Sequence, residues 1–543
     1  MPTVSEELPN APEVIPVESE EQVEEAREAE GALEEELRPK APVAEVGPQS
    51  VAFVWSGSLP ETAIGEGVYW VDRLLRGYRL LEAAGTLLWR EVQVIEADEA
   101  LGSLEALNAF HDEEYLQAVA ALSEEQASRW SNEAFGFSEK GTHAFPGMAD
   151  IAGWYVAAAR SAMQVLLSGQ AMRAVSLAGG QPHARRDRAE SGDIFNDVLL
   201  ALLDARAAGH KVAFLNLEAE HPIVVEEWFI NDPGMLMISM HEGPDFHYPG
   251  TGFVEAMGER AGHGFNVNIP LPPGAGDREY RWAFEQIVPP LFEIFEPDIV
   301  VLLAGSSTHF AEPLAHLRLT SAGYQVLIER ISVLAPRLVM LGGGGSDMDV
   351  SARLWAIALG ALTERLAALP RNLPADYASE WGEGSFHDDL LPALSSEMQA
   401  YVTERTRRSV FQLQRALFPL WGLPVSTEVA DSLEEEAMPY RLSDGLMQAA
   451  PPAQPSRELV RRRGVEEVRT EVRGRGASGA PLEESAEERS RSKQRRDRRV
   501  RKKRGREESG QGAERQAAAQ HEEGSKSRKK RRRKRRGVQS DIE

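Results

Sequence analysis

Short runs of almost continuous apolar residues alternate with amphipathic stretches through the middle of this 543-residue chain. A strand that is apolar on both faces must be buried on both, which is typical of a parallel sheet with helices on either side. The predicted strands are residues 51–55, 173–177, 211–217, 235–240, 265–271, 299–304 and 337–341. The predicted helices are residues 153–168, 193–208, 279–295, 321–334 and 350–369. This alternation predicts an α/β fold built around one mostly parallel sheet.

Charge divides the chain into three blocks. Residues 1–47 hold 14 Glu against 3 Lys and Arg, and residues 451–543 hold 30 Lys and Arg against 16 Asp and Glu. Because the whole chain carries a net charge of −25, the block between them is strongly acidic. Both ends are also poor in aromatic residues, so we expect an acidic disordered tail at 1–48 and a basic low-complexity disordered tail at 451–543. We predict the α/β domain at 49–370 and a helical C-terminal extension of it at 371–450.

The sequence contains no cysteine. This excludes disulfides, thiolate metal ligands and cysteine nucleophiles. The N-terminus lacks the basic and apolar segments of a secretory signal, and no run of about 18 apolar residues predicts a membrane span. We therefore expect a cytoplasmic protein without a membrane partner, and the composition favours a bacterial source, where association with the nucleoid is one option.

Several short motifs punctuate the predicted α/β domain. They are Asn-Leu-Glu-Ala-Glu-His-Pro-Ile-Val-Val-Glu-Glu at 216–227, His-Asp-Glu-Glu-Tyr at 111–115, Gly-Gly-Gln-Pro-His-Ala at 179–184, Asn-Asp at 196–197, Ser-Met-His at 239–241, Tyr-Pro-Gly-Thr-Gly at 248–252, Asn-Val-Asn-Ile-Pro-Leu at 266–271, Leu-Thr at 319–320 and four glycines at 342–345. In this order and spacing they resemble the histone deacetylase family, which includes bacterial acetoin-utilisation and acetylpolyamine deacetylases. The resemblance covers about residues 51–365. It implies the three-layer α/β sandwich of the arginase and deacetylase type.

The resemblance also implies a zinc hydrolase, in which the metal polarises an acetyl carbonyl and activates water. The family holds zinc with Asp, His and Asp, but the matching positions here carry Glu218, Glu220 and Ser307. Two histidines move protons in the family. Here Pro182 replaces the first, and His183 remains as the general acid or base position.

Three further positions depart from the family pattern. Ser346 replaces the Tyr whose hydroxyl stabilises the oxyanion. Gly192 replaces the aromatic residue that walls the acyl-lysine tunnel, and Gly141 replaces the acid that grips the substrate backbone. Because the changes fall in five separate motifs whose other residues match, we expect the zinc mechanism to be lost.

Other ions remain as alternatives for these carboxylates. Glu218 and Glu220 are two residues apart at a strand end and so lie on the same side, where a hard cation such as Mg²⁺ or Ca²⁺ has oxygen ligands. The competing interpretation is that they pair with a nearby Arg or His. The resemblance also implies a structural potassium ion, and its positions are Asn216, Glu218, Glu220, Ser239 and Met240. Otherwise we expect no cofactor, and zinc only if the family activity is retained.

Four histidines follow predicted strands near these positions, namely His183, His221, His241 and His309. One hypothesis is a rebuilt site with a different geometry. The other is that these rings hydrogen-bond to backbone or carboxylate groups as parts of the frame.

Two cationic runs dominate the C-terminal tail. Dense Lys and Arg bind nucleic-acid phosphates by counterion release, without base specificity. An acidic protein is the alternative partner. The residues in question are Arg495, Arg496, Arg498, Arg499, Arg501, Lys502, Lys503, Arg504, Lys529, Lys530, Arg531, Arg532, Arg533, Lys534, Arg535 and Arg536.

Two functional hypotheses follow from the sequence. The first is a deacetylase-like protein without zinc-dependent activity, which acts as a binding or scaffold module with a basic tail. The second is a working deacetylase or amidohydrolase that acts on acetyl-lysine or acetylpolyamine with an atypical metal site.

Overall fold

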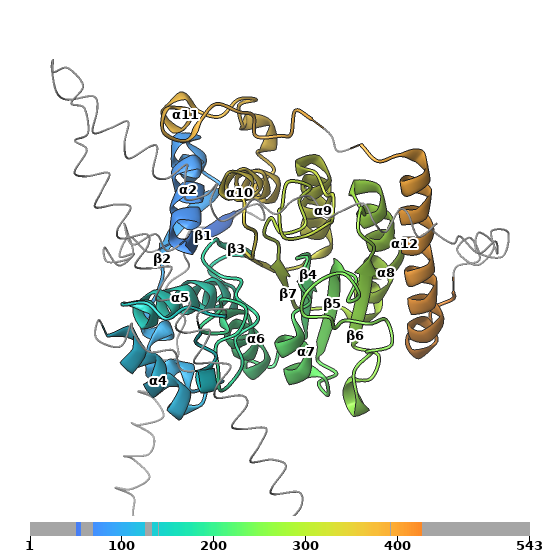
Figure 1. Cartoon of the computed structure of the whole chain (residues 1–543), viewed down its shortest axis with the longest axis horizontal. Helices are drawn as coiled ribbons and strands as arrows, with labels where there is room; N and C mark the ends of the chain where they lie inside the picture. Colours follow the sequence, from blue (N-terminus) through green and yellow to red (C-terminus); the bar gives the residue numbers. More distant parts are fainter. Residues whose placement is uncertain (1–49, 56–68, 125–132, 139–140, 391–392, 426–543) are drawn as a thin grey trace, which may run out of the picture. The chain divides into compact units, whose positions relative to one another are not determined.

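Eight parallel strands form one open sheet in the order β2-β1-β3-β8-β7-β4-β5-β6 (Figure 1). The strands are β1 (Val51–Trp55), β2 (Val92–Glu96), β3 (Arg173–Ser176), β4 (Val212–Asn216), β5 (Met235–Glu242), β6 (Asn266–Leu271), β7 (Ile299–Leu303) and β8 (Leu338–Leu341). This computed structural model describes residues 50–55, 69–124, 133–138, 141–390 and 393–425. Both predicted tails, with every basic tail residue named above, and residues 426–450 of the predicted extension lie outside these ranges.

Helices cover both faces of the sheet, as the apolar strands require. The helices are α2 (Tyr69–Ala83), α3 (Leu104–Leu107), α4 (Glu113–Ser123), α5 (Met148–Leu167), α6 (Asp197–Ala207), α7 (Ile223–Phe229), α8 (Asp277–Phe295), α9 (Ser321–Leu334), α10 (Met348–Leu362), α11 (Ala375–Trp381) and α12 (Ser396–Leu417). Helices α2, α10, α9 and α8 pack in succession along one side, and α4, α5 and α6 pack together on the other (Figure 1). The predicted α/β sandwich with a parallel sheet is confirmed.

The core follows from the apolar runs. Every residue of β1, β4, β7 and β8 is buried. Strand β2 was not predicted, because its sequence Val-Gln-Val-Ile-Glu is short and its side chains are only partly buried at the edge of the sheet. Helix α10 ends at Leu362, earlier than the expected residue 369, and a separate 3-10 turn follows at Leu366–Ala368.

The residues after the α/β core form helices that pack back onto it. Helix α12 lies against α8 and against β6, the strand at one edge of the sheet. Among the helices in the described ranges, none combines the length and apolar character of a membrane span.

Candidate functional site

The predicted site residues follow the carboxyl ends of neighbouring strands. His183 follows β3, Ser346 follows β8, Ser307 follows β7, and Glu218 and Glu220 follow β4. These four strands are consecutive in the sheet. Because parallel strands end at the same edge, the fold brings the five positions to one region, the place where α/β proteins usually bind ligands.

Glu218 turns its carboxylate onto the loop after β7. One oxygen accepts a hydrogen bond from the Gly305 N–H, and the other accepts one from the Ser307 hydroxyl. The residue is 4% exposed, and this burial raises the pKa of Glu218 from 4.5 to about 7. Gly343, with φ 66°, comes so close that an added Cβ would lie 2.0 Å from a Glu218 carboxylate oxygen. Glycine is therefore required there by both space and backbone conformation.

Glu220 has different neighbours. Its Oε1 lies 3.5 Å from Nε2 of His247, as an ion pair without hydrogen-bond geometry. The other ring nitrogen of His247 lies 3.5 Å from Glu242, and Glu242 in turn binds Nδ1 of His316 at 2.8 Å. Glu218 and Glu220 thus lie at the same edge of the sheet but bind separate groups. For Glu220 the partner is a histidine, in agreement with the interpretation that these carboxylates pair with a nearby Arg or His.

Opposite charges set the protonation states of Glu220 and His247. Burial alone would raise the pKa of Glu220, but His247 and His183 outweigh burial and lower it. Burial alone would lower the pKa of His247, but Glu220 and Glu242 outweigh burial and raise it. The ionised carboxylate and the protonated imidazole therefore stabilise one another.

Asn216 is one of the residues at the predicted potassium position. Its amide nitrogen donates to the Glu220 carbonyl at 3.1 Å and to the Ser239 hydroxyl at 3.0 Å, while its amide oxygen accepts from the Glu218 N–H at 3.3 Å. The orientation follows from chemistry, since a carbonyl accepts only and an N–H donates only. Met240 is fully buried beside Ser239. The Glu220 carbonyl and the Ser239 hydroxyl are oxygens that a potassium ion would need as ligands. In this structure they bind the amide nitrogen of Asn216 instead, so the arrangement does not favour potassium.

His183 lies at the position predicted for a general acid or base. Its backbone N–H donates to Asp193 at 2.8 Å, and its Nδ1 is buried without a partner among the described residues. Burial lowers the pKa of His183. The ring of Tyr248 lies across it, with centroids 6.1 Å apart. The preceding Pro182 offers only its carbonyl, which accepts from Asn196 at 2.7 Å.

Ser346 ends the glycine run after β8. Its N–H donates to Glu312 at 2.6 Å, and burial raises the pKa of Glu312. Arg73 of α2 fixes the run from the other side by donating to the carbonyls of Gly343 and Gly345. Hydrogen bonds to its backbone therefore hold the run from both sides.

The other three histidines do not form a shared site. Each ring nitrogen has a hydrogen-bond partner, as the frame interpretation predicted. The partners are Thr251 and Glu226 for His221, Ser239 and Gly252 for His241, and Asp388 and Ala311 for His309.

A model of the histone deacetylase domain matches residues 71–362, more than half of the chain. The chain belongs to the histone deacetylase family. It is 30% identical over 263 residues to the acetoin utilization protein AcuC of Bacillus subtilis, which is 47% of this chain and 68% of AcuC. It is 29% identical to histone deacetylase 8 of Xenopus tropicalis over 281 residues, 51% of this chain and 74% of that protein. Human histone deacetylase 1 is 24% identical over 372 residues, 68% of this chain and 76% of that protein.

The residues at the family's zinc positions do not fit zinc. Both oxygens of Glu218 are engaged by Gly305 and Ser307. The Ser307 oxygen also accepts from the Ala219 N–H at 2.8 Å. Across the described part of the chain, no group of three or more His, Cys, Asp or Glu is arranged to hold a metal ion. Zinc in proteins needs three or four such ligands.

The sequence did not single out three residues that shape this region, His247, Glu242 and Glu312. Two of them adjoin recognised motifs, because His247 precedes Tyr-Pro-Gly-Thr-Gly and Glu242 follows Ser-Met-His. Their position next to these motifs was the only sequence feature that could have identified them as site residues. Glu312 lies in the loop after β7, and nothing in its local pattern marks it.

Proposed function

We propose that this member of the histone deacetylase family does not carry out zinc-dependent deacetylation and acts as a binding module, in the cytoplasm. One observation carries the proposal. Two of the three family zinc positions are hydrogen-bonded to one another, since the Glu218 carboxylate accepts from the Ser307 hydroxyl and from the Gly305 N–H, and Ser307 is a poor ligand in place of a carboxylate.

A second candidate is an active deacetylase or amidohydrolase with an atypical metal site. Its support is the 30% identity to a protein named for acetoin utilization and the similarity to proteins named histone deacetylases. Glu220 also supports it, because 27% of its side chain is exposed next to His247 and accessible to a metal ion.

Metal content and turnover distinguish the two candidates. We expect the purified full chain to carry far less than one zinc per chain and to release no acetate above the blank from acetyl-lysine peptides or acetylpolyamines. Metal is measured by mass spectrometry of the digested protein, and acetate by a coupled assay. The control is a histone deacetylase 8 preparation treated in the same way.

Stoichiometric zinc together with turnover would contradict the first candidate. If turnover appears, the variant Glu220→Ala shows whether it belongs to this site. Loss of acetate release in that variant would support the atypical metal site, and unchanged release would point to a contaminating enzyme.

The proposed binding role extends to the basic runs near the C-terminus. Residues 529–536 are eight consecutive Lys or Arg. Such a run binds the phosphates of DNA or RNA mainly through release of counterions, so its affinity falls steeply with salt. An acidic protein is the competing partner, and it would also respond to salt.

Replacement of residues 529–536 by Gln in the full chain is expected to weaken binding to duplex DNA and to make it less dependent on salt. Eight contacts correspond to a slope of about −7 in a plot of log affinity against log salt concentration. Binding is measured by fluorescence anisotropy at several salt concentrations. The matched control changes Arg531, Arg532 and Arg533 to Lys, which keeps the charge and should keep most of the affinity. Equal binding by the Gln variant would rule out this run as the contact.

A further inference from the structure

A hydrogen bond joins two loops from opposite sides of the predicted site. The Tyr248 hydroxyl, in the loop after β5, donates to a carboxylate oxygen of Glu190, in the loop after β3, at 2.9 Å. Strands β3 and β5 are not neighbours, because β8, β7 and β4 lie between them. Four strand intervals correspond to about 19 Å. The two loops therefore meet across the ends of the three strands that are followed by Ser346, Ser307 and Glu218.

The acceptor carboxylate is held in place from its other side. The second oxygen of Glu190 accepts from Nε of Arg185 at 2.6 Å, and the guanidinium of Arg185 also pairs with Glu227 of α7 at 2.9 Å. Burial alone would raise the pKa of Glu190, but the hydrogen bonds from Tyr248 and Arg185 outweigh burial and lower it. Glu190 is therefore an ionised acceptor at neutral pH, and a hydrogen bond to a charged acceptor is stronger than one between neutral groups.

The ring of Tyr248 lies at the border between solvent and the site. Its centroid is 6.1 Å from that of the His183 ring, with an angle of 68° between the planes. The preceding residue, His247, lies 3.5 Å from Glu220. Tyr248 itself is 44% exposed and does not belong to the hydrophobic core. Rotation of this side chain into solvent breaks the bond to Glu190 and the contact with His183, and it leaves the core packing intact.

We propose that Tyr248 and Glu190 form a latch across the entrance to the site, which a ligand displaces to reach His183 and Glu220. One hydrogen bond near the protein surface closes the latch, and a bond of this kind favours the closed state by about threefold to tenfold. The latch is thus closed in most molecules, and it opens without unfolding of a helix or strand. The inference goes beyond the proposed loss of deacetylation, because neither latch residue is at a family zinc or proton-transfer position.

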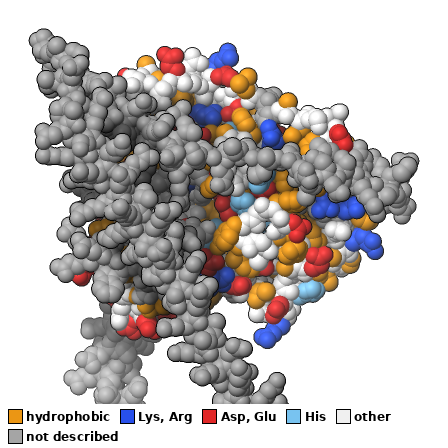
Figure 2. Space-filling model, in the orientation of Figure 1, with side chains coloured by type: hydrophobic (Ala, Val, Ile, Leu, Met, Phe, Trp, Pro, Cys, Tyr) orange, Lys and Arg blue, Asp and Glu red, His pale blue; other side chains and the backbone are white. Residues whose placement is uncertain are grey.

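Chemical labelling of His183 tests the latch. Diethyl pyrocarbonate acylates neutral imidazole, and burial lowers the pKa of His183, so this ring is neutral at pH 8 with or without Glu190. The chain has 12 histidines, and Figure 2 shows histidine side chains at the surface. The label is therefore measured in single peptides by mass spectrometry of a tryptic digest. His183 is the only histidine of the tryptic peptide 174–185.

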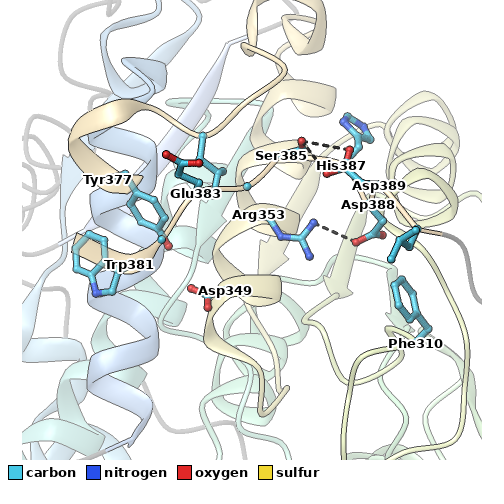
Figure 3. Close-up of a pocket in the computed structure, with 14 residues that line it drawn as sticks. Phe310, Asp349, Arg353, Tyr377, Trp381, Glu383, Ser385, His387, Asp388 and Asp389 are labelled. Atoms are coloured by element: carbon cyan, nitrogen blue, oxygen red, sulfur yellow. Dashed lines mark hydrogen bonds and ion pairs between the residues drawn. The ribbon is translucent and has the colours of Figure 1, made fainter. Parts of the chain in front are cut away.

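A histidine in a separate recess serves as the internal control. The recess in Figure 3 has a volume of about 390 Å³, lies between α10, α11 and the loop after α11, and contains no latch residue. His387 lines it and is partly exposed, as His183 is. It is the only histidine of the tryptic peptide 372–405. A change in the latch should leave the labelling rate of His387 as it is.

Two substitutions open the latch from its two sides. Tyr248→Phe keeps the ring and removes the donor, and Glu190→Ala removes the acceptor. Each is expected to raise the labelling rate of His183 about threefold or more and to leave His387 unchanged. The double variant should be no faster than the faster single variant, because both substitutions remove the same hydrogen bond. The matched control is Asp187→Asn, an exposed carboxylate of the same loop that lies 3.4 Å from Arg188.

Three results would overturn the latch. They are unchanged labelling of His183 in both single variants, effects that multiply in the double variant, and an equal rise at His387, which would indicate general loosening of the fold. Faster labelling of His183 alone, at an unchanged Tm, supports it. The label reports access to His183 and not release of acetate, so the outcome is separate from the question of whether the site is active.

Discussion

Replacement of Asp388 by Ala is expected to lower the free energy of unfolding by about 3–5 kcal/mol, the usual cost of leaving a buried charge without its partner. Asp388 follows α11, and its side chain is 6% exposed. One oxygen accepts from Arg353 at 3.1 Å, and the other accepts from His309 at 3.0 Å and from the Ser321 N–H at 2.7 Å. The carboxylate thus connects α10, the start of α9 and the loop after β7.

The protonation of Asp388 agrees with this role. Burial alone would raise its pKa, but the hydrogen bonds from His309 and Ser321 outweigh burial and hold the pKa well below its usual range. A depressed pKa means that this stabilisation is present above the ordinary value of 3.8 and is lost as the pH falls below it. Asn at this position would also be destabilising, because its amide N–H group would face Arg353 or the donors of His309 and Ser321.

Urea unfolding followed by circular dichroism at pH 7 measures the effect. The matched control is Asp389→Ala at the next residue, whose side chain is 65% exposed and lies 4.0 Å from Arg371. It should change stability by less than about 0.5 kcal/mol, as exposed positions usually do. Equal effects of the two substitutions would show that the buried network contributes little.

Glu218→Gln is the second substitution with a large expected effect, and its sign depends on pH. Because burial raises the pKa of Glu218 from 4.5 to about 7, the folded protein keeps the neutral form over a range in which the unfolded chain is ionised. The contribution of Glu218 to the free energy of unfolding therefore has its full value below pH 4.5 and decreases as the pH rises towards 7. The loss amounts to about 3 kcal/mol between these limits.

Gln removes this titration and keeps the size of the side chain. The free energy of unfolding of Glu218→Gln, relative to the unmodified protein, should therefore rise by about 3 kcal/mol from pH 4.5 to pH 8. Urea midpoints at four or five pH values measure the difference. Subtraction of the parent curve also removes the titration of Asp197, whose pKa is raised to about 7 by burial.

Glu220→Gln provides a control of opposite sign. Its carboxylate has a lowered pKa and an ion pair with His247, so its replacement should destabilise the protein at neutral pH. A difference between Glu218→Gln and the parent that stays constant from pH 5 to pH 8 would mean that the buried carboxylate is ionised throughout.

The predictable part of the fold was the part that burial determines. Strands β4 and β7 are apolar along their whole length, and the sequence pattern locates them to within one residue. Strand β2 has no such pattern, because an edge strand needs only part of its surface buried. Local sequence cannot mark it, since its position depends on its pairing with β1.

The site also has a part that the sequence predicted, the positions of its residues, and a part that it did not, the contacts between them. Position in a motif identified Glu218 and Ser307, and the strand order brings them together. Their direct hydrogen bond was not predictable from the sequence, since it depends on how closely the loop after β7 approaches β4. The pairing of Glu220 with His247 was also missed in detail, because these residues are distant in sequence and meet only through the loop after β5.

The order of the strands in the sheet has a consequence for synthesis of the chain. Strands β1, β2 and β3 pair among themselves, and so do β4, β5 and β6, but the two sets meet only through β7 and β8. A nascent chain that has not reached β7 therefore has two three-stranded fragments whose inner edges, β3 and β4, lack their neighbours, and β3 and β7 lack theirs until β8 is complete at Leu341. Exposed apolar edges of this kind favour aggregation and slow folding. Ribosome pausing or chaperone contact before residue 341 would thus affect the yield of this protein more than an interruption after it.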